Sequence, residues 1–230
     1  MKKFGVIVAG GSGTRMGSEI PKQFLQLKGK SIIYHSINAF FNAFENIHII
    51  IVLPKAHIET GRKLQAQFPN KTLSIVEGGL TRFDSVKNGL QLVEKDSIVF
   101  VHDAVRCLVS IEVIKRCYKQ AFLKGSAIPA VAATDSIRIM TSDETSEVAD
   151  RNKVRIVQTP QTFVSNLLLP VFEQPYNESF TDEASVVEYA GKAVYLVEGC
   201  YSNIKITRPI DLILAEKIME ERDAVTEKSN

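Results

Sequence analysis

FGVIVAGGSGTRMGSEIPKQF, from Phe4 to Phe24, joins a short apolar run to a loop rich in glycine. The apolar part, residues 4–9, has the length and composition of a buried β-strand. Glycine fills three of the five positions from residue 9 to residue 13, and such a loop lets backbone N–H groups surround an anion. Arg15 and Lys22 add two cations, and the proline before the lysine restricts its backbone. The stretch predicts a strand followed by a phosphate-binding loop.

The chain beyond this loop alternates short apolar segments with amphipathic segments of helical length. Strands are expected at 4–9, 47–53, 72–76, 97–101 and 126–131, and helices at 31–44, 56–68, 82–95 and 111–125. The strands are nearly continuous hydrophobic runs, as expected when helices cover both faces of a sheet. The order predicts an α/β fold of the Rossmann-like type, with a mostly parallel, twisted sheet and helices on both faces.

The pattern changes after residue 131. Apolar and polar residues alternate here on both sides of a polar turn at 141–147, and no apolar residues recur at helical spacing. This pattern predicts a β-arm that protrudes at about 134–160. Further helices are expected at 165–174, 181–191 and 208–222, and strands at 192–199 and 203–207. Thr181 is the predicted N-cap of its helix. Because no repeat, linker or domain boundary is evident, residues 1–230 are predicted to form one domain that carries this arm.

Composition and charge exclude several classes of protein. The net charge is +2, from 28 basic and 26 acidic residues. The chain therefore lacks the strong positive electrostatic field that non-specific binding of nucleic acid needs. No apolar run reaches the roughly 20 residues that span a bilayer, and no signal-peptide core follows the first residues. We expect a cytoplasmic protein with no nucleic-acid or membrane partner. Cys107, Cys117 and Cys200 are widely spaced, which predicts reduced thiols instead of a disulfide framework or a zinc site.

Two familiar phosphate-binding motifs do not fit the glycine loop. The dinucleotide fingerprint G-x-G-x-x-G matches Gly11 and Gly13 but then meets Met16, which disfavours a nicotinamide-dependent oxidoreductase. No glycine has the continuation of a Walker A motif. A tight turn without a ligand remains the structural alternative, and the cations Arg15 and Lys22 argue against it. The loop therefore predicts a polyphosphate ligand clamped by these two side chains.

Several motifs together resemble a known family. AGGSGTRM followed by PKQF resembles the signature of sugar-phosphate nucleotidyltransferases. In order along the chain, EGGLTRFDSVKNGL (77–90), VHDAVR (101–106), QTPQTF (158–163), TDEASVVE (181–188) and NIKITRP (203–209) resemble 2-C-methyl-D-erythritol 4-phosphate cytidylyltransferases. The resemblance covers about residues 4 to 215. Ribitol 5-phosphate cytidylyltransferases share several motifs and are the alternative. The segment KITRP and the spacing from Arg151 to Thr159 favour methylerythritol phosphate.

The resemblance implies a reaction and a set of partners. CMP would pass from CTP to 2-C-methyl-D-erythritol 4-phosphate, with release of pyrophosphate, in the non-mevalonate synthesis of isoprenoid precursors. Mg²⁺ would be the divalent cation, and two copies of the chain would form a homodimer through the arm. Such a transfer needs positioning and charge stabilisation but no protein nucleophile.

The resemblance also implies roles for individual residues. The catalytic residues would be Arg15, Lys22, Arg151 and Lys205. The CTP-binding residues would be Ala9, Gly10, Gly11, Ser12, Gly13, Gly79, Arg82, Ser85 and Ala104. The residues that bind the acceptor would be Asp103, Arg106, Ser136, Thr159 and Thr181.

Asp103 is also a candidate from its position alone. It follows a predicted strand, at the edge where open α/β sheets bind ligands, and a carboxylate there suits Mg²⁺. Its neighbour His102 is interpreted as a packed or hydrogen-bonding residue and not as a ligand. Two other candidates also have a purely structural interpretation: Thr181 could serve only as a helix cap, and Lys205 could be a solvated residue of an edge strand.

Two departures from the family pattern affect these expectations. Val105 and Cys107 replace the usual alanine and proline, so the loop after Arg106 is expected to be looser. Val154 and Arg155 replace the usual Leu-Trp, which predicts different packing of the arm and an additional cation near the acceptor phosphate.

Overall fold

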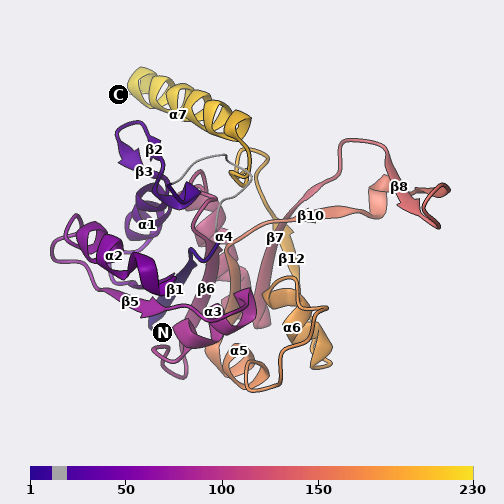
Figure 1. Ribbon diagram of the computed structural model, residues 1–230, viewed down its shortest axis with the longest axis horizontal. Coiled ribbons are helices and arrows are strands. Elements are labelled where there is room, and N and C mark those ends of the chain that lie inside the picture. Colours follow the sequence, from indigo (N-terminus) through magenta and orange to yellow (C-terminus); the bar gives the residue numbers. More distant parts are fainter. Residues whose placement is uncertain (12–19, 230) are drawn as a thin grey trace.

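A computed structural model describes the chain over residues 1–11 and 20–229. Its main sheet runs in the order β10-β7-β11-β6-β1-β4-β5, with β12 also paired to β7 (Figure 1). The strands are β1 (Lys3–Val8), β4 (His48–Leu53), β5 (Leu73–Glu77), β6 (Ile98–Asp103), β7 (Ser126–Ala132), β10 (Arg155–Val157), β11 (Gln161–Val164) and β12 (Leu196–Glu198). β1 lies parallel to both β4 and β6, and β11 is antiparallel to β6 and β7. The predicted α/β fold with a mostly parallel sheet is confirmed.

Helices pack on both faces of this sheet. α1 (Ile32–Ala43), α2 (Ile58–Gln65) and α4 (Ile111–Lys124) belong to one apolar cluster, and α3 (Arg82–Leu90), α5 (Ser165–Val171) and α6 (Glu183–Tyr189) belong to the other. Alternate residues of each central strand enter opposite clusters: in β4, Ile49 and Ile51 enter the first, while Ile50 and Val52 enter the second. Two-sided burial explains why these strands are continuous apolar runs in the sequence.

The last helix, α7 (Pro209–Ser229), covers the edge of the molecule near the carboxyl ends of the central strands. A third apolar cluster lies under it and includes Leu27 of the β2–β3 hairpin (Gln26–Leu27 and Lys30–Ser31), together with Val105, Ile206 and Ala215. This cluster ties the loop after β6 to the segment before α7. Within the described ranges, none of the helices is sufficiently long and apolar to cross a membrane.

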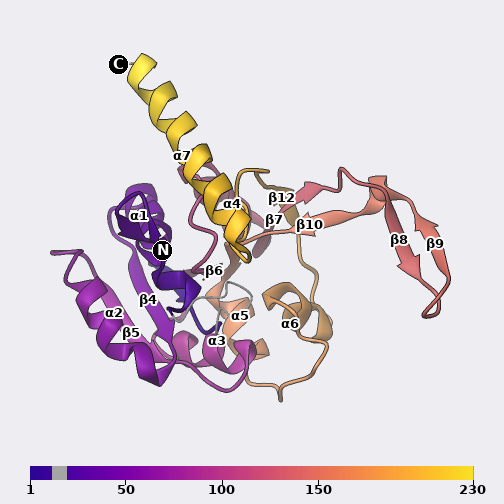
Figure 2. The same ribbon diagram turned by 45° about the horizontal axis from the view of Figure 1, so that its top comes forward.

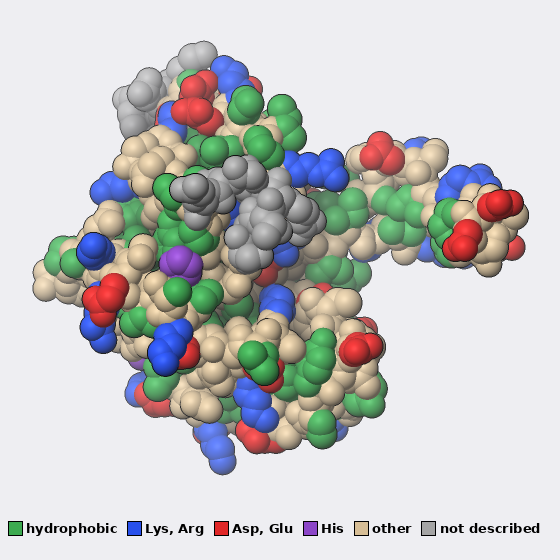
Figure 3. All heavy atoms as spheres, viewed as in Figure 1, with side chains coloured by type: hydrophobic (Ala, Val, Ile, Leu, Met, Phe, Trp, Pro, Cys, Tyr) green, Lys and Arg blue, Asp and Glu red, His purple; other side chains and the backbone are tan. Residues whose placement is uncertain are grey.

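A small antiparallel sheet of β8 (Ile137–Met140) and β9 (Ser146–Ala149) extends away from the main sheet (Figures 1 and 2). It is followed by the short 3₁₀ turn η4 (Arg151–Lys153); two further 3₁₀ turns, η2 (Lys22–Phe24) and η3 (Lys55–His57), precede α1 and α2. The arm, which we define as residues 133–154, carries the exposed apolar side chains Ile139, Met140 and Val148. Figure 3 shows hydrophobic and charged side chains together along it.

Three local expectations differ from the structure. Residues 192–199 contribute only the short strand β12, and residues 203–207 form no strand. The N-cap of α6 is Asp182, not Thr181: the Asp182 carboxylate accepts from the backbone N–H of Ser185, whose hydroxyl accepts from the N–H of Asp182 in return. A carboxylate serves this position better than a threonine one residue earlier, because it reaches the free N–H groups of the first turn.

Candidate functional site

A cavity of about 350 Å³ lies at the carboxyl ends of β1 and β6, where an open α/β sheet binds ligands. Five parts of the chain meet there: the end of β1 and the glycines after it, the turn η2, the loop before α3, the end of β6, and the segment before α7. The lining residues are Val8, Ala9, Gly10, Gly11, Lys22, Gln23, Gly79, Leu80, Thr81, Arg82, Ser85, Asp103, Val105 and Lys205.

The glycines that line the cavity differ in the space that a side chain would have. A Cβ on Gly79 would lie 2.2 Å from the Cβ of Asp84, so no side chain fits where this loop folds against α3. Among residues 1–11 and 20–229, the atom nearest to a Cβ on Gly10 would be the hydroxyl of Ser85 at 3.8 Å, and the atom nearest to one on Gly11 would be Cε of Lys22 at 4.0 Å. Gly79 is required by packing, whereas Gly10 and Gly11 keep the cavity open beside their backbone.

The loop before α3 is fixed by its own helix. The side chain of Thr81 accepts from the backbone N–H of Asp84, and the Asp84 carboxylate accepts from the N–H of Thr81 in return, which forms a capping box. The buried hydroxyl of Ser85 accepts from the N–H of Gly79 at 3.1 Å. These hydrogen bonds hold the backbone of the cavity wall at this point.

Lys22 and Gln23 reach the cavity from η2. Gln23 is buried and donates from Nε2 to the backbone carbonyl of Ala9 at 2.8 Å, so the turn is tied directly to the end of β1. Lys22 is also largely buried and lines the cavity. The predicted partner of Lys22 in a clamp, Arg15, lies outside the described residues, as do Ser12 and Gly13.

Asp103 lies at the floor of the cavity among three cations. The Nζ atom of Lys205 is 2.9 Å from its carboxylate, Nη2 of Arg82 is 3.3 Å away and Nε of Arg106 is 3.7 Å away. Burial alone would raise the pKa of this carboxyl, but the three positive charges hold the pKa of Asp103 well below its usual range. Asp103 is therefore ionised and fixed from several sides.

Arg82 connects this carboxylate to a second one. Its guanidinium donates from Nη1 and Nη2 to the two carboxylate oxygens of Glu183 and, at 3.3 Å, from Nη2 to Asp103. Glu183 is the first residue of α6 and is only 1% exposed. Burial works against the charge of Arg82, yet the two carboxylates raise its pKa above the usual range.

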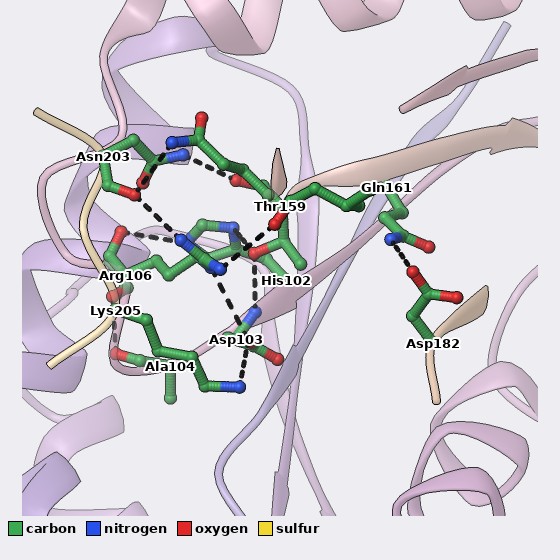
Figure 4. A network of polar contacts seen from close by, with 12 residues as sticks. His102, Asp103, Ala104, Arg106, Thr159, Gln161, Asp182, Asn203 and Lys205 are labelled. Atoms are coloured by element: carbon green, nitrogen blue, oxygen red, sulfur yellow. Dashed lines mark hydrogen bonds and ion pairs between the residues drawn. The ribbon is translucent and has the colours of Figure 1, made fainter. Parts of the chain in front are cut away.

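A buried histidine sets the backbone around Asp103 (Figure 4). Nε2 of His102 contacts the carbonyl of Arg106 at 3.2 Å, and Nδ1 contacts the hydroxyl of Thr159 at 2.8 Å. A carbonyl can only accept, so Nε2 carries the proton and Nδ1 accepts from Thr159. The Thr159 oxygen in turn accepts from the N–H of Asp103. Burial lowers the pKa of His102 to about 4, so the ring is neutral and the network keeps one orientation.

Arg106 and Asn203 form the base beneath Lys205. Arg106 donates to the backbone carbonyls of Asn203 at 2.9 Å and Val157 at 3.4 Å. The buried amide of Asn203 donates to the carbonyl of Thr159. These contacts anchor the segment that holds Lys205, and they direct the guanidinium of Arg106 into the protein instead of the cavity.

The loop after Arg106 is held without the proline that the family pattern contains. Arg106 donates its N–H to the Asp103 carbonyl, and Ile206 donates its N–H to the Val105 carbonyl. Val105 and Cys107 are buried in the cluster under α7. These contacts hold the loop after Arg106 from both sides, and its expected looseness stays a prediction. All three cysteines are free thiols, as predicted, although Cys200 is only partly buried.

Other predicted residues lie away from the cavity. Ala104 is buried and its N–H donates to Val8, and the hydroxyl of Thr159 serves the histidine network. Ser136 and Arg151 are exposed on the arm, where Arg151 donates to the carbonyl of Thr134. Thr181 is exposed beside α6, and its N–H donates to Ser185.

Arg155 donates to carbonyls of its own segment at Asn152 and Val154, and its expected position near the acceptor phosphate stays a prediction. It also borders a different hollow, beside β12.

Gln23, Glu183 and Asn203 are parts of the site that motif reasoning did not single out. Glu183 and Asn203 lie inside the quoted segments TDEASVVE and NIKITRP, so the motif itself was the available signal. Gln23 lines the cavity, whereas Glu183 and Asn203 are buried behind it. Their partners are distant in sequence, so only the fold brings these side chains to the residues that they hold.

Comparisons with known proteins agree with this geometry. A family model described as 2-C-methyl-D-erythritol 4-phosphate cytidylyltransferase matches residues 4–221. A relative of the same name from Bacteroides fragilis is 46% identical over 221 residues, which cover 95% of this chain and 100% of the relative.

Solved structures give the same result. An enzyme of that name from Francisella tularensis superposes with a TM-score of 0.79 at 30% identity, covering 94% of this chain and 98% of the other. The 4-diphosphocytidyl-2C-methyl-D-erythritol synthase of Anaerococcus prevotii superposes with a TM-score of 0.82 at 25% identity, covering 95% and 98%. The chain belongs to the family of 2-C-methyl-D-erythritol 4-phosphate cytidylyltransferases.

Proposed function

We propose that this chain transfers CMP from CTP to 2-C-methyl-D-erythritol 4-phosphate, giving 4-diphosphocytidyl-2-C-methylerythritol and pyrophosphate in the non-mevalonate synthesis of isoprenoid precursors. Family membership supports this reaction. The observation that carries it is the cavity, in which the backbone of Gly10 and Gly11 faces the side chains of Lys22, Asp103 and Lys205. Amides and fixed cations suit a nucleoside triphosphate.

In the proposed reaction an oxygen of the acceptor phosphate attacks the α-phosphorus of CTP. A new P–O bond forms as the bond to the oxygen that bridges the α- and β-phosphates breaks, and pyrophosphate leaves with that electron pair. Negative charge grows on the α-phosphate and on the leaving group. We assign to Lys22, and to Arg15 from the sequence, the stabilisation of this charge, and to Lys205 the placement of the acceptor phosphate.

Asp103 fits a divalent cation, which we propose to be Mg²⁺. The carboxylate of Asp103 lines the cavity, and the protein would supply it as a ligand while phosphate oxygens and water took the remaining positions. That donor set suits Mg²⁺, which retains its waters and bridges phosphates. When bound, the ion would neutralise phosphate charge during the transfer.

The arm is the proposed contact between two copies of the chain. Its exposed apolar side chains suit burial in a homodimer, and Ser136 and Arg151 on it would then serve the acceptor site of the partner subunit. Thr181 would act from beside α6. We propose a cytoplasmic enzyme with one nucleotidyltransferase domain and this arm.

Pyrophosphate release from each of the four NTPs tests the proposal, with methylerythritol phosphate and ribitol 5-phosphate as competing acceptors. We expect release with CTP and methylerythritol phosphate alone. A preference for ribitol 5-phosphate would reassign the acceptor while keeping the nucleotide site. Absence of release with CTP and either acceptor would contradict the proposed function.

A further inference from the structure

The side chain of Arg82 lies between the cavity and the buried carboxylate of Glu183. It is the first residue of α3, lines the cavity, and its side chain is 32% exposed. Its closer ion pair is with Glu183 and its more distant one, at 3.3 Å, is with Asp103. The guanidinium therefore faces the ligand space while its charge is largely taken up by a carboxylate behind it.

The side chain of Glu183, unlike that of Arg82, is fully enclosed by the protein. Its carboxylate is 1% exposed and pairs with both terminal nitrogens of Arg82. Burial raises the pKa of this carboxyl, and the adjacent guanidinium opposes that rise. The position is also fixed from the backbone, since the N–H of the next residue, Ala184, donates to the side chain of Gln161 at 2.8 Å.

The result is a row of alternating charges, Lys205, Asp103, Arg82 and Glu183, from the cavity into the protein. We propose that Glu183 is a positioning residue of the transfer reaction: it holds Arg82 at the cavity wall and balances its charge, so that Arg82 orients Asp103 instead of moving onto the triphosphate. The inference rests on the proposed function, since the ligand of the cavity is taken to be CTP.

Glu183→Gln keeps the volume and one acceptor but removes the charge that restrains Arg82. The freed guanidinium gains attraction for the polyanion, so metal-free CTP binds more tightly, by roughly three- to tenfold for one unit charge near a partly exposed site. Arg82 then no longer fixes Asp103, so kcat falls by roughly tenfold. A residue that only stabilises the fold would weaken CTP binding or leave it unchanged.

The experiment is calorimetric titration of the full-length protein with CTP in EDTA, without acceptor, followed by steady-state kinetics with both substrates. Glu188→Gln is the matched control, because it removes the same charge from an exposed position of the same helix; its CTP affinity and kcat are expected to equal those of the wild type. The double variant Arg82→Gln/Glu183→Gln should lose the gain in affinity. Raising the salt concentration should shrink the gain of Glu183→Gln.

The possible results distinguish the positioning role of Glu183 from the proposed binding of CTP. A folded Glu183→Gln protein whose CTP affinity is unchanged or weaker overturns the positioning role. A wild-type protein that does not bind CTP contradicts the proposed function instead. Where Glu183→Gln does not fold, Glu183→Asp decides, since it keeps the charge but cannot hold both nitrogens: we expect undiminished CTP affinity with a lower kcat, and an unchanged kcat overturns the inference.

Discussion

Lys205 and Asp103 meet at the cavity floor, with the lysine Nζ 2.9 Å from the aspartate Oδ2. The lysine comes from the irregular segment before α7 and the aspartate from the end of β6. Arg82 and Arg106 also approach this carboxylate, so Lys205 is one of three cations around it, and its side chain is 42% exposed at the cavity. Its half-exposed ammonium can therefore serve a ligand.

Lys205→Met is expected to lower kcat/KM for the acceptor roughly 100-fold, as for loss of one group that stabilises charge in the transition state. The melting temperature should change little, because the lysine side chain is 42% exposed and exposed ion pairs contribute little to stability. Steady-state kinetics and thermal unfolding measure the two effects. Lys192→Met, at an exposed position, is the control, and an unaltered kcat/KM in Lys205→Met would remove this lysine from the reaction.

Asp103→Asn is expected to cost about 3 kcal/mol of unfolding free energy at pH 7, because three cations lose their shared carboxylate. The folded-state pKa of Asp103 is depressed, so its contribution is complete above its unfolded pKa of about 4 and is lost as the pH falls from there toward the folded value. The difference in unfolding free energy between wild type and variant should therefore decrease as the pH falls from about 5 to about 2, on either side of the unfolded pKa. Urea unfolding at several pH values measures it; a gap independent of pH would contradict the assignment.

Two glycine substitutions should separate packing from binding. Gly79→Ala forces the loop away from Asp84 and is expected to cost roughly 1–3 kcal/mol of stability, with weaker CTP binding. A Cβ on Gly11 meets no atom of the described residues closer than 4.0 Å, so for Gly11→Ala we expect an unchanged melting temperature and a higher KM for CTP. Thermal unfolding and CTP kinetics on both proteins distinguish them. Equal loss of stability in the two variants would show that both glycines are packing residues.

Mixing two inactive variants tests whether the arm serves a partner subunit. Lys22→Ala disables the cavity and Arg151→Ala disables the arm, so each protein alone should have little activity. After subunit exchange, a mixed dimer contains one site with both residues intact, and about a quarter of the wild-type activity should return. If Arg151 acts within its own subunit, mixing restores nothing.

The central strands could be predicted from the sequence because two-sided burial leaves a continuous apolar run, as in β1 and β4. The expected strand at 203–207 is wrong because alternation there has another cause. Ile204 and Ile206 pack into the cluster with α7 while Lys205 faces the cavity, so the pattern reflects two environments and not a sheet.

The site was accessible to sequence reasoning where a residue type carries its own chemistry. Lys22 follows a glycine-rich loop and Asp103 ends a strand, whereas Lys205 was assigned only through the family resemblance; the structure brings all three to one cavity. Glu183 could not be assigned in this way, because a glutamate in the first turn of a helix usually only favours the helix dipole. Its partner Arg82 is supplied by a different helix, and that pairing depends on the packing of α3 and α6 against one sheet.

The position of Lys205 late in the chain also constrains when the site is completed during synthesis. β1, β4, β5 and β6 have all left the ribosome once residue 103 has emerged, and Asp103 can then meet Arg82. The counter-charge from residue 205 and the carboxylate from residue 183 arrive only after about as many residues again have been translated. A nascent chain can therefore contain its central strands well before Glu183 and Lys205 are available to complete the ion pairs at the cavity.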